Sequence, residues 1–248
     1  MHSEAPSPRA WDAIIVAGGR ARRLGGIDKT ALLWHGRSLL DGVLAAAAGA
    51  GRICVVGSEA NLPDSVLRTV ERPRWGGPAA AIVAGLEALN AAAGPGTDSD
   101  WILVLAGDLL RPSEAVTALL EELDVVTGAD DTPGADDTID VGSMIVDGVI
   151  AVDGAGRRQP LLAVYRRAAL ETAASAVGSA ENLSVMSLIG ALTLHELPLP
   201  ETLSADVDTP ADAARVGIEV PRPASSPGHH PDAGRPAGPN DDLPAPPV

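Results

Sequence analysis

The sequence predicts one α/β domain with a doubly wound, mainly parallel sheet and helices on both of its faces, a three-layer α/β/α arrangement. Three observations lead to this prediction. Short apolar runs alternate along the chain with helical segments of about ten residues, which is the pattern of successive strand and helix units. The runs at residues 13–16 and 101–105 are continuously apolar, as is typical of parallel strands buried on both faces. The 248 residues are 46% hydrophobic, which is enough for one continuous core.

Six segments have the composition of strands and six have that of helices. The strands are expected at residues 12–17, 52–57, 66–71, 101–105, 141–146 and 160–165, and the helices at residues 38–49, 79–92, 113–123, 166–177, 183–190 and 210–217. Because crossovers between parallel strands are right-handed, the loops after the first, third and fourth strands should lie along one edge of the sheet. Ligands of open α/β sheets bind at this carboxyl edge, so the site is expected there.

The domain is expected to span residues 11–220, between two disordered ends. Residues 1–10 are polar and interrupted by proline. Residues 221–248 hold nine of the chain's 21 prolines and almost no bulky apolar side chain, so they cannot bury enough surface to offset the entropy of ordering. The two histidines in this tail, His229 and His230, are not expected to bind metal, because no neighbouring group would orient them. The acidic stretch 130–140 is predicted to be a solvated surface excursion.

Charge and cysteine content narrow the classes of partner. The formal net charge of −15 argues against broad contact with nucleic acid or an anionic membrane, since both favour clustered Lys and Arg. The single cysteine, Cys54, lies in a predicted buried strand and is expected to be a core thiol. One cysteine allows neither a disulfide within the chain nor a cysteine zinc site. These features, with no signal-peptide pattern and no long apolar run, predict a cytoplasmic protein.

The most informative segment is the loop after the first predicted strand, which combines glycines with cations. Gly18 and Gly19 lack a Cβ, so their backbone N–H groups can approach an anion closely. Arg22, Arg23 and Lys29 would add positive charge around the same anion, and Arg can bind phosphate oxygens through two nitrogens. The loop has neither the Gly-Lys pair of a P-loop nor the GxGxxG spacing of a dinucleotide site. It predicts a site for a nucleoside triphosphate.

Two acidic segments are candidates for binding a divalent metal ion beside that loop. Asp108 comes just after the apolar run at 101–105, which places it at the ligand edge of the sheet. Asp206 and Asp208 are spaced so that both face the same side of an extended segment. Asp212 is explained by capping of the helix that starts at residues 209–210. Mg²⁺ prefers one or two carboxylates together with phosphate oxygens and water, so Asp108 is the first predicted Mg²⁺ ligand. Asp208 is preferred to Asp206 as the second, because its segment resembles a family element described below.

The glycine-rich loop resembles the LAGGxxxRMGGxDK signature of the molybdenum cofactor guanylyltransferases, the MobA-like branch of the nucleotidyltransferases. Val16 stands for the leading Leu of that signature and Leu24 for its Met, and the Asp28-Lys29 pair follows at the expected distance. Three further segments resemble the family elements GPLAGI, (Q/H)PLxALY and (N/D)(V/I)(N/D)TPED, at residues 76–78, 159–165 and 206–212.

The resemblance implies a Rossmann-like nucleotidyltransferase fold that transfers GMP from GTP to molybdopterin and releases pyrophosphate. It implies nucleotide binding by Val16, Ala17, Gly18, Gly19, Lys29, Gly77, Pro78 and Asp108. The catalytic groups would be Lys29, Arg22, Arg23 and Asp108, with the cations stabilising the leaving pyrophosphate. The acceptor phosphate is already anionic, so the reaction needs alignment and charge neutralisation rather than a general base. Transient contact with molybdenum cofactor enzymes or their chaperones would be in keeping with this activity.

Departures from the family pattern leave other functions open. Asp108-Leu109-Leu110 stands for the family's Asp-x-Pro, so the carboxylate is kept and the proline turn is lost. Glu71 stands where an Asp is frequent, and Asn182 lies in a segment without the usual Arg or Lys. A cytidylyltransferase acting on molybdopterin or another phosphorylated acceptor would use nearly the same loop. An alternative of another class is a nucleotide-binding regulatory module that has lost turnover.

Overall fold

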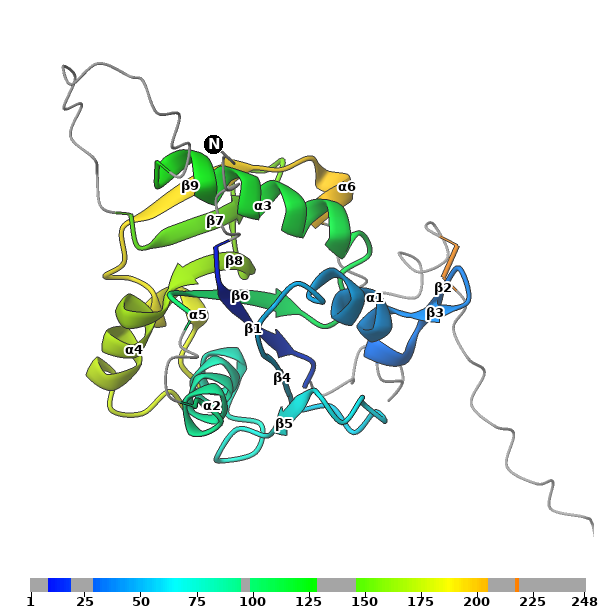
Figure 1. Ribbon diagram of the computed structural model, residues 1–248, viewed down its shortest axis with the longest axis horizontal. Helices are drawn as coiled ribbons and strands as arrows, with labels where there is room; N and C mark the ends of the chain where they lie inside the picture. Colours follow the sequence, from blue (N-terminus) through cyan, green and yellow to red (C-terminus); the bar gives the residue numbers. More distant parts are fainter. Residues whose placement is uncertain (1–8, 19–28, 95–98, 129–145, 205–216, 219–248) are drawn as a thin grey trace, which may run out of the picture.

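The structure is a computed structural model that describes residues 9–18, 29–94, 99–128, 146–204 and 217–218 (Figure 1). Seven strands form one sheet in the order β5-β4-β1-β6-β8-β7-β9. Their bounds are Trp11–Val16 for β1, Ile53–Val56 for β4, Leu67–Thr69 for β5, Trp101–Ala106 for β6, Gly148–Val152 for β7, Arg158–Arg166 for β8 and Leu194–Pro198 for β9. Only β8 among these seven runs antiparallel to its neighbours, so the predicted doubly wound, mainly parallel sheet is confirmed.

Helices cover both faces of the sheet, which makes three layers (Figure 1). One face carries α1 (Leu39–Ala46) and α3 (Pro112–Val126), and the other carries α2 (Pro78–Ala91), α4 (Arg167–Ala176) and α5 (Val185–Leu188). Shorter elements are the 3-10 turn η2 (Lys29–Ala31), the hairpin strands β2 (Leu33–Trp34) and β3 (Arg37–Ser38), and α6 (Glu201–Ser204).

The alternation of side chains along β1 divides the core in two. Ala13 and Ile15 pack in the cluster that includes α1 and α3, whereas Ile14 and Val16 pack in the cluster that includes α2, α4 and α5. All four are buried because the central strand of a parallel sheet is covered on both faces. The two helical layers that cover β1 therefore explain why this strand is continuously apolar in sequence.

Most predicted elements have a counterpart in the structure, and most of the differences lie in the C-terminal half. The sequence did not predict β7, β9, α6 or the β2–β3 hairpin. The helix expected at 183–190 is the single turn α5. The strand expected at 141–146 and the helix expected at 210–217 fall almost entirely outside the described residues, as do the two ends expected to be disordered.

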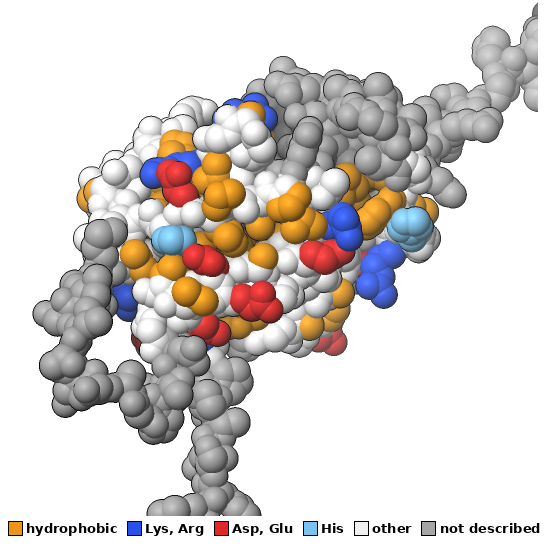
Figure 2. Space-filling model, turned by 90° about the horizontal axis from the view of Figure 1, so that it is seen from above, with side chains coloured by type: hydrophobic (Ala, Val, Ile, Leu, Met, Phe, Trp, Pro, Cys, Tyr) orange, Lys and Arg blue, Asp and Glu red, His pale blue; other side chains and the backbone are white. Residues whose placement is uncertain are grey.

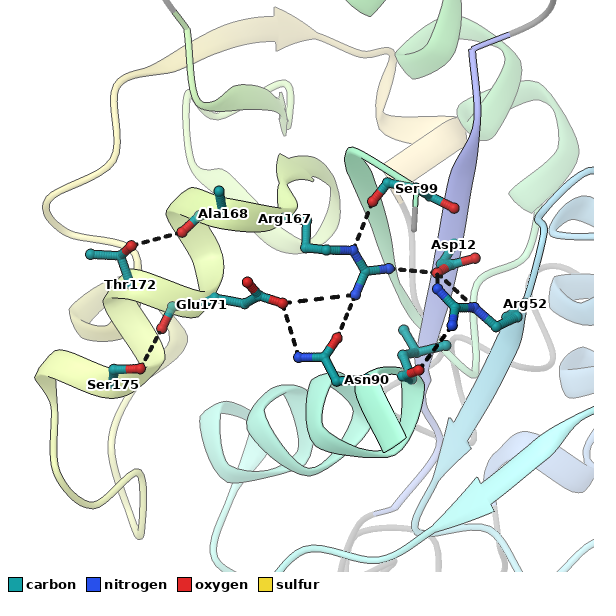
Figure 3. A network of polar contacts seen from close by, with 10 residues as sticks. Asp12, Arg52, Asn90, Ser99, Arg167, Ala168, Glu171, Thr172 and Ser175 are labelled. Atoms are coloured by element: carbon teal, nitrogen blue, oxygen red, sulfur yellow. Dashed lines mark hydrogen bonds and ion pairs between the residues drawn. The ribbon is translucent and has the colours of Figure 1, made fainter. Parts of the chain in front are cut away.

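A polar network joins β1, β4, α2 and α4 at the amino edge of the parallel strands (Figure 3). Asp12 is fully buried, and its Oδ2 accepts hydrogen bonds from Arg52 and from Arg167. Arg167 also donates to the carbonyl of Ser99 and to the side chain of Asn90, at 2.7 Å each. Because this network lies at the far edge from the predicted ligand site, it holds the layers together without entering that site.

Candidate functional site

The ends of β1 and β6 place two of the predicted segments side by side. Val16 pairs with Ala106 in the parallel register, and the amide of Gly107 donates to the carbonyl of Val16 at 2.9 Å. On the other side, the amide of Ala17 donates to the carbonyl of Val56 at 2.9 Å. The glycine-rich loop and Asp108 therefore leave the sheet at the same edge, as the strand order predicts.

The start of the glycine-rich loop lies against the turn that follows β4. A Cβ built on Gly57 would be 2.6 Å from the Cα of Gly18, and Gly57 has a φ of +85°. Both the close approach and the positive φ require glycine here. Gly57 was not recognised from the sequence, although a glycine just beyond a buried strand is the signal that could have indicated it.

Lys29 and Asp108 meet across this edge. The Nζ of Lys29 lies 3.9 Å from Oδ2 of Asp108, and the two side chains are 22% and 21% exposed. Lys29 opens η2, and the following residue, Thr30, is buried and anchors that turn. A partly exposed ammonium beside a partly exposed carboxylate can bind a phosphate through the first and a divalent cation through the second.

A third segment, around Gly77 and Pro78, forms the start of α2. Gly77 has a φ of +93° and Pro78 occupies the first helical turn, so the helix begins abruptly after a turn that only glycine adopts readily. The carboxylate of Glu71, a buried residue, accepts from the amide of Trp75 at 2.9 Å and shapes this turn. The amide of Asn182 donates to the carbonyl of Gly76 at 2.7 Å, so the departures at 71 and 182 both support the same loop.

A cavity of about 340 Å³ extends from this site toward β8. Its wall comes from Pro78 at the start of α2, Ala106 and Leu109 around the end of β6, and residues 159–162 and 184–186. Leu109, one of the departures from the family pattern, also lines a second cavity of about 360 Å³ beside the β2–β3 hairpin and the start of α3. The turn that carries Asp108 therefore separates two cavities.

Several predicted site residues fall outside the described residues: Gly19, Arg22, Arg23 and Asp208. The described ranges bring together Val16, Ala17, Gly18, Lys29 and Asp108 at one edge, with Gly77 and Pro78 at the start of the adjoining helix. Within those ranges no group of three His, Cys, Asp or Glu side chains is arranged to hold a metal ion. Asp108, which is partly exposed at the end of β6, is a described carboxylate to which a cation at this edge could bind. In the described parts of the chain, no helix is long and apolar enough to cross a membrane.

Most of the described chain, including the candidate site, falls within the match to a known protein family. A family model described as the MobA-like NTP transferase domain matches residues 13–195. The chain belongs to the MobA-like NTP transferase family. This confirms the family that the glycine-rich loop indicated.

One curated relative of this MobA-like chain matches over part of its length. A molybdenum cofactor guanylyltransferase from Acidiphilium cryptum (strain JF-5) is 37% identical over 94 residues, which are 36% of this chain and 48% of that protein. The chain thus spans about half the length of the curated relative that it matches.

Two solved structures share the fold of the MobA-like chain. Rv0371C from Mycobacterium tuberculosis, crystallised as a complex with manganese, aligns with a TM-score of 0.52 at 17% identity, covering 84% of this chain and 97% of that one. The inositol-1-phosphate CTP transferase from T. maritima aligns with a TM-score of 0.56 at 15% identity, covering 83% of this chain and 92% of that one. The Rossmann-like nucleotidyltransferase fold is therefore confirmed.

Proposed function

We propose that this MobA-like chain transfers GMP from GTP to molybdopterin and releases pyrophosphate. The observation that carries the proposal is the pairing of Lys29 with Asp108, at 3.9 Å, on the sheet edge where the glycine-rich loop begins. The family to which the chain belongs and the name of the A. cryptum relative support a guanylyl donor and a molybdenum cofactor acceptor. The substrates are then a nucleoside triphosphate and a phosphorylated acceptor.

In the proposed reaction, an oxygen of the acceptor phosphate forms a bond to the α-phosphorus of GTP. The bond from that phosphorus to its bridging oxygen breaks, and its electron pair leaves with pyrophosphate. The ammonium group of Lys29, which lies beside Asp108, would neutralise the charge that develops on the leaving group. The backbone N–H groups of Gly18 and Gly19 would hold phosphate oxygens, and Arg22 and Arg23 would add charge to the same region. No side chain has to remove a proton.

The residues at this edge fit a divalent cation in part. Asp108 offers a partly exposed carboxylate at the end of β6, and Asp208 is the second proposed ligand. When bound, Mg²⁺ would supply charge neutralisation between the phosphates, which is its usual contribution to phosphoryl chemistry. Asp108 would hold the ion, while Lys29 would neutralise negative charge of the phosphates that the ion does not neutralise.

A cytidylyltransferase is the second candidate, because the fold is shared with the inositol-1-phosphate CTP transferase from T. maritima. Such an enzyme would use the same edge and the same Lys29 and Asp108. The two candidates differ in the base of the nucleotide, and therefore in contacts away from the phosphates.

Binding of GTP, CTP, ATP and UTP to the purified chain with and without Mg²⁺ tests the proposal. We expect selective, Mg²⁺-dependent binding of GTP that weakens about tenfold or more in Lys29→Ala and in Asp108→Asn. Preference for CTP would favour the second candidate. Tight GTP binding that is unaffected by Asp108→Asn, without pyrophosphate release, would instead indicate a regulatory nucleotide-binding module.

A further inference from the structure

The cavity at the end of β6 and the start of β8 has an uncharged wall as far as the described residues form it. Among these lining residues there is no Lys, Arg, Asp or Glu, and the polar side chains belong to Gln159 and Ser184. The hydroxyl of Ser184 accepts from the amide of Ser187 at 3.0 Å and shares a 2.7 Å hydrogen bond with the hydroxyl of Ser187. Ser184 therefore caps the start of α5, and Gln159 is the other polar side chain of the described wall.

An irregularity in β8 forms part of this wall. The antiparallel register pairs Ile150 with Ala163, but the next residue of β7, Ala151, pairs with Gln159. Residues 160–162 consequently have no partner on β7, and all three line the cavity. Bulges of this kind occur beside active sites because they redirect side chains, and here the bulge begins directly after Gln159.

The orientation of the Gln159 amide is fixed by Asp153. Its Nε2 donates to Oδ2 of Asp153 at 2.9 Å. Asp153 also accepts from the amides of Ala155 and Arg157, at 2.9 and 3.0 Å, and from Nε of Arg157 at 2.9 Å. The backbone N–H of Arg157 is the main cause that lowers the pKa of Asp153, so this carboxylate is ionised and can only accept.

The fixed amide leaves one polar atom for a ligand. Because Nε2 faces Asp153, the remaining atom of the Gln159 amide is its carbonyl oxygen, Oε1, which accepts hydrogen bonds but cannot donate them. No hydrogen bond to Oε1 from the described residues is present. A ligand that pairs with Gln159 must therefore present an N–H or O–H group.

We infer that Gln159 selects the acceptor substrate by accepting a hydrogen bond from a ring N–H of an uncharged heteroaromatic group bound in this cavity. The inference rests on the proposed nucleotidyl transfer. An apolar wall with one oriented polar group is typical of sites that bind a flat ring rather than a highly charged sugar phosphate. Asp153 acts as the positioning residue of this contact.

The sheet order favours the acceptor rather than the nucleotide as the occupant of the cavity. Gly18 and Gly57, at the ends of β1 and β4, are on one side of Asp108, and Gln159, at the start of β8, is on the other. Pro78 is the predicted nucleotide-binding residue that also lines the cavity, so the cavity adjoins the predicted nucleotide site. A guanine base also carries ring N–H donors, so the base of GTP and the ring of the acceptor both present the group that Oε1 of Gln159 requires. Only the acceptor is expected to depend on Gln159.

The test uses the full chain with neopterin, a fluorescent pterin with ring N–H groups, and with myo-inositol 1-phosphate for comparison. Gln159→Leu removes the amide at similar volume, and Arg158→Gln is the matched control, since Arg158 pairs with Glu196 and does not line the cavity. We expect Gln159→Leu to weaken neopterin binding about tenfold and to leave Mg²⁺-dependent GTP binding and thermal stability unchanged. Arg158→Gln should bind neopterin as the wild type does.

A positioning role for Asp153 has its own readout. Asp153→Asn should weaken neopterin binding in the wild-type background but have no further effect in Gln159→Leu, because Asp153 acts through Gln159. If Gln159→Leu does not fold, Asp153→Asn tests the inference instead: weaker neopterin binding at unchanged GTP affinity would support it, and unchanged neopterin binding would overturn it.

The inference would be overturned by equal neopterin affinity in wild type and Gln159→Leu, by binding of myo-inositol 1-phosphate in preference to neopterin, or by no binding of either compound. Loss of GTP affinity in Gln159→Leu would assign the cavity to the nucleotide and would also overturn it. A wild-type chain that binds neopterin through Gln159 but binds no nucleotide would refute the proposed function and leave the cavity assignment intact.

Discussion

At the scale of single residues, the contact between Gly18 and Gly57 limits what the phosphate loop can tolerate. A Cβ on Gly57 would lie 2.6 Å from the Cα of Gly18, at a φ of +85°. We expect Gly57→Ala to destabilise the fold by about 1–3 kcal/mol and to weaken GTP binding, since the loop must move. Urea unfolding and GTP titration measure the two effects. Gly154→Ala is the control, because no described residue other than its chain neighbours has an atom within 4 Å of its Cβ position; an equal loss in both variants would contradict the prediction.

The single thiol gives a prediction on reactivity. Burial raises the pKa of Cys54 to about 11 from 9.0, so the native thiol stays protonated at pH 8. Only the thiolate reacts quickly with disulfide reagents. We expect the native chain to be nearly inert to 5,5′-dithiobis(2-nitrobenzoate) at pH 8 and to react fully in guanidinium chloride. Fast reaction of the native chain would show that β4 opens readily. The free energy of unfolding should decline above pH 9, because Cys54 then loses its proton in the unfolded chain but keeps it in the folded one.

Residue types alone predicted part of the site and could not predict the rest. Lys29 and Asp108 were predicted because each stands at a recognisable end of a strand or loop, and the structure places them 3.9 Å apart. The roles of Gly57 and Asp153 depend on segments that meet only after folding. Such contacts leave no local pattern in a single sequence.

At the scale of elements, the network around Asp12 joins β1 to the residue before β4 and to α2 and α4, which form one of the two helical layers (Figure 3). Arg167 is buried and supplies hydrogen bonds to Asp12, Ser99 and Asn90. We expect Arg167→Met to lower the free energy of unfolding by about 3–5 kcal/mol, because it removes a partner from a fully buried carboxylate. Urea unfolding measures this loss.

The control for this substitution is Arg158→Met, which breaks an ion pair whose side chains are 40% and 50% exposed. That loss should stay below about 1 kcal/mol. GTP affinity should be retained in Arg167→Met wherever the chain is folded, since the network lies at the opposite edge from Lys29. A loss for Arg167→Met as small as for the control would mean that Arg52 alone satisfies Asp12.

The elements that could be predicted are those with an unbroken local pattern. The apolar runs of β1 and β6 are buried on both faces, so their sequence carries a clear signal. β9 is an edge strand that alternates partly buried and exposed residues and ends in Pro198, a composition that resembles a loop. The β2–β3 hairpin has two residues in each strand, too few for a periodic pattern.

At the scale of the whole molecule, the strand order divides the proposed substrates. The glycine loop and Gly57 lie at β1 and β4, whereas the cavity with Gln159 lies at β6 and β8. The turn with Asp108 is between them, where the two phosphates would meet. The face seen in Figure 2 carries separate Lys and Arg side chains with Asp and Glu between them. A chain with a net charge of −15 would then attract a phosphate chiefly through cations close to the site.

The last prediction concerns the segment at 221–248. Its nine prolines and its lack of bulky apolar residues predict that it adds nothing to the core. A chain ending at residue 220 should therefore keep the GTP affinity of the full chain and a melting temperature within about 2 °C of it. Calorimetry and thermal unfolding of the two chains measure both quantities. A clear fall in either would show that the segment packs on the domain or reaches the nucleotide, in spite of a composition that offers little apolar surface to bury.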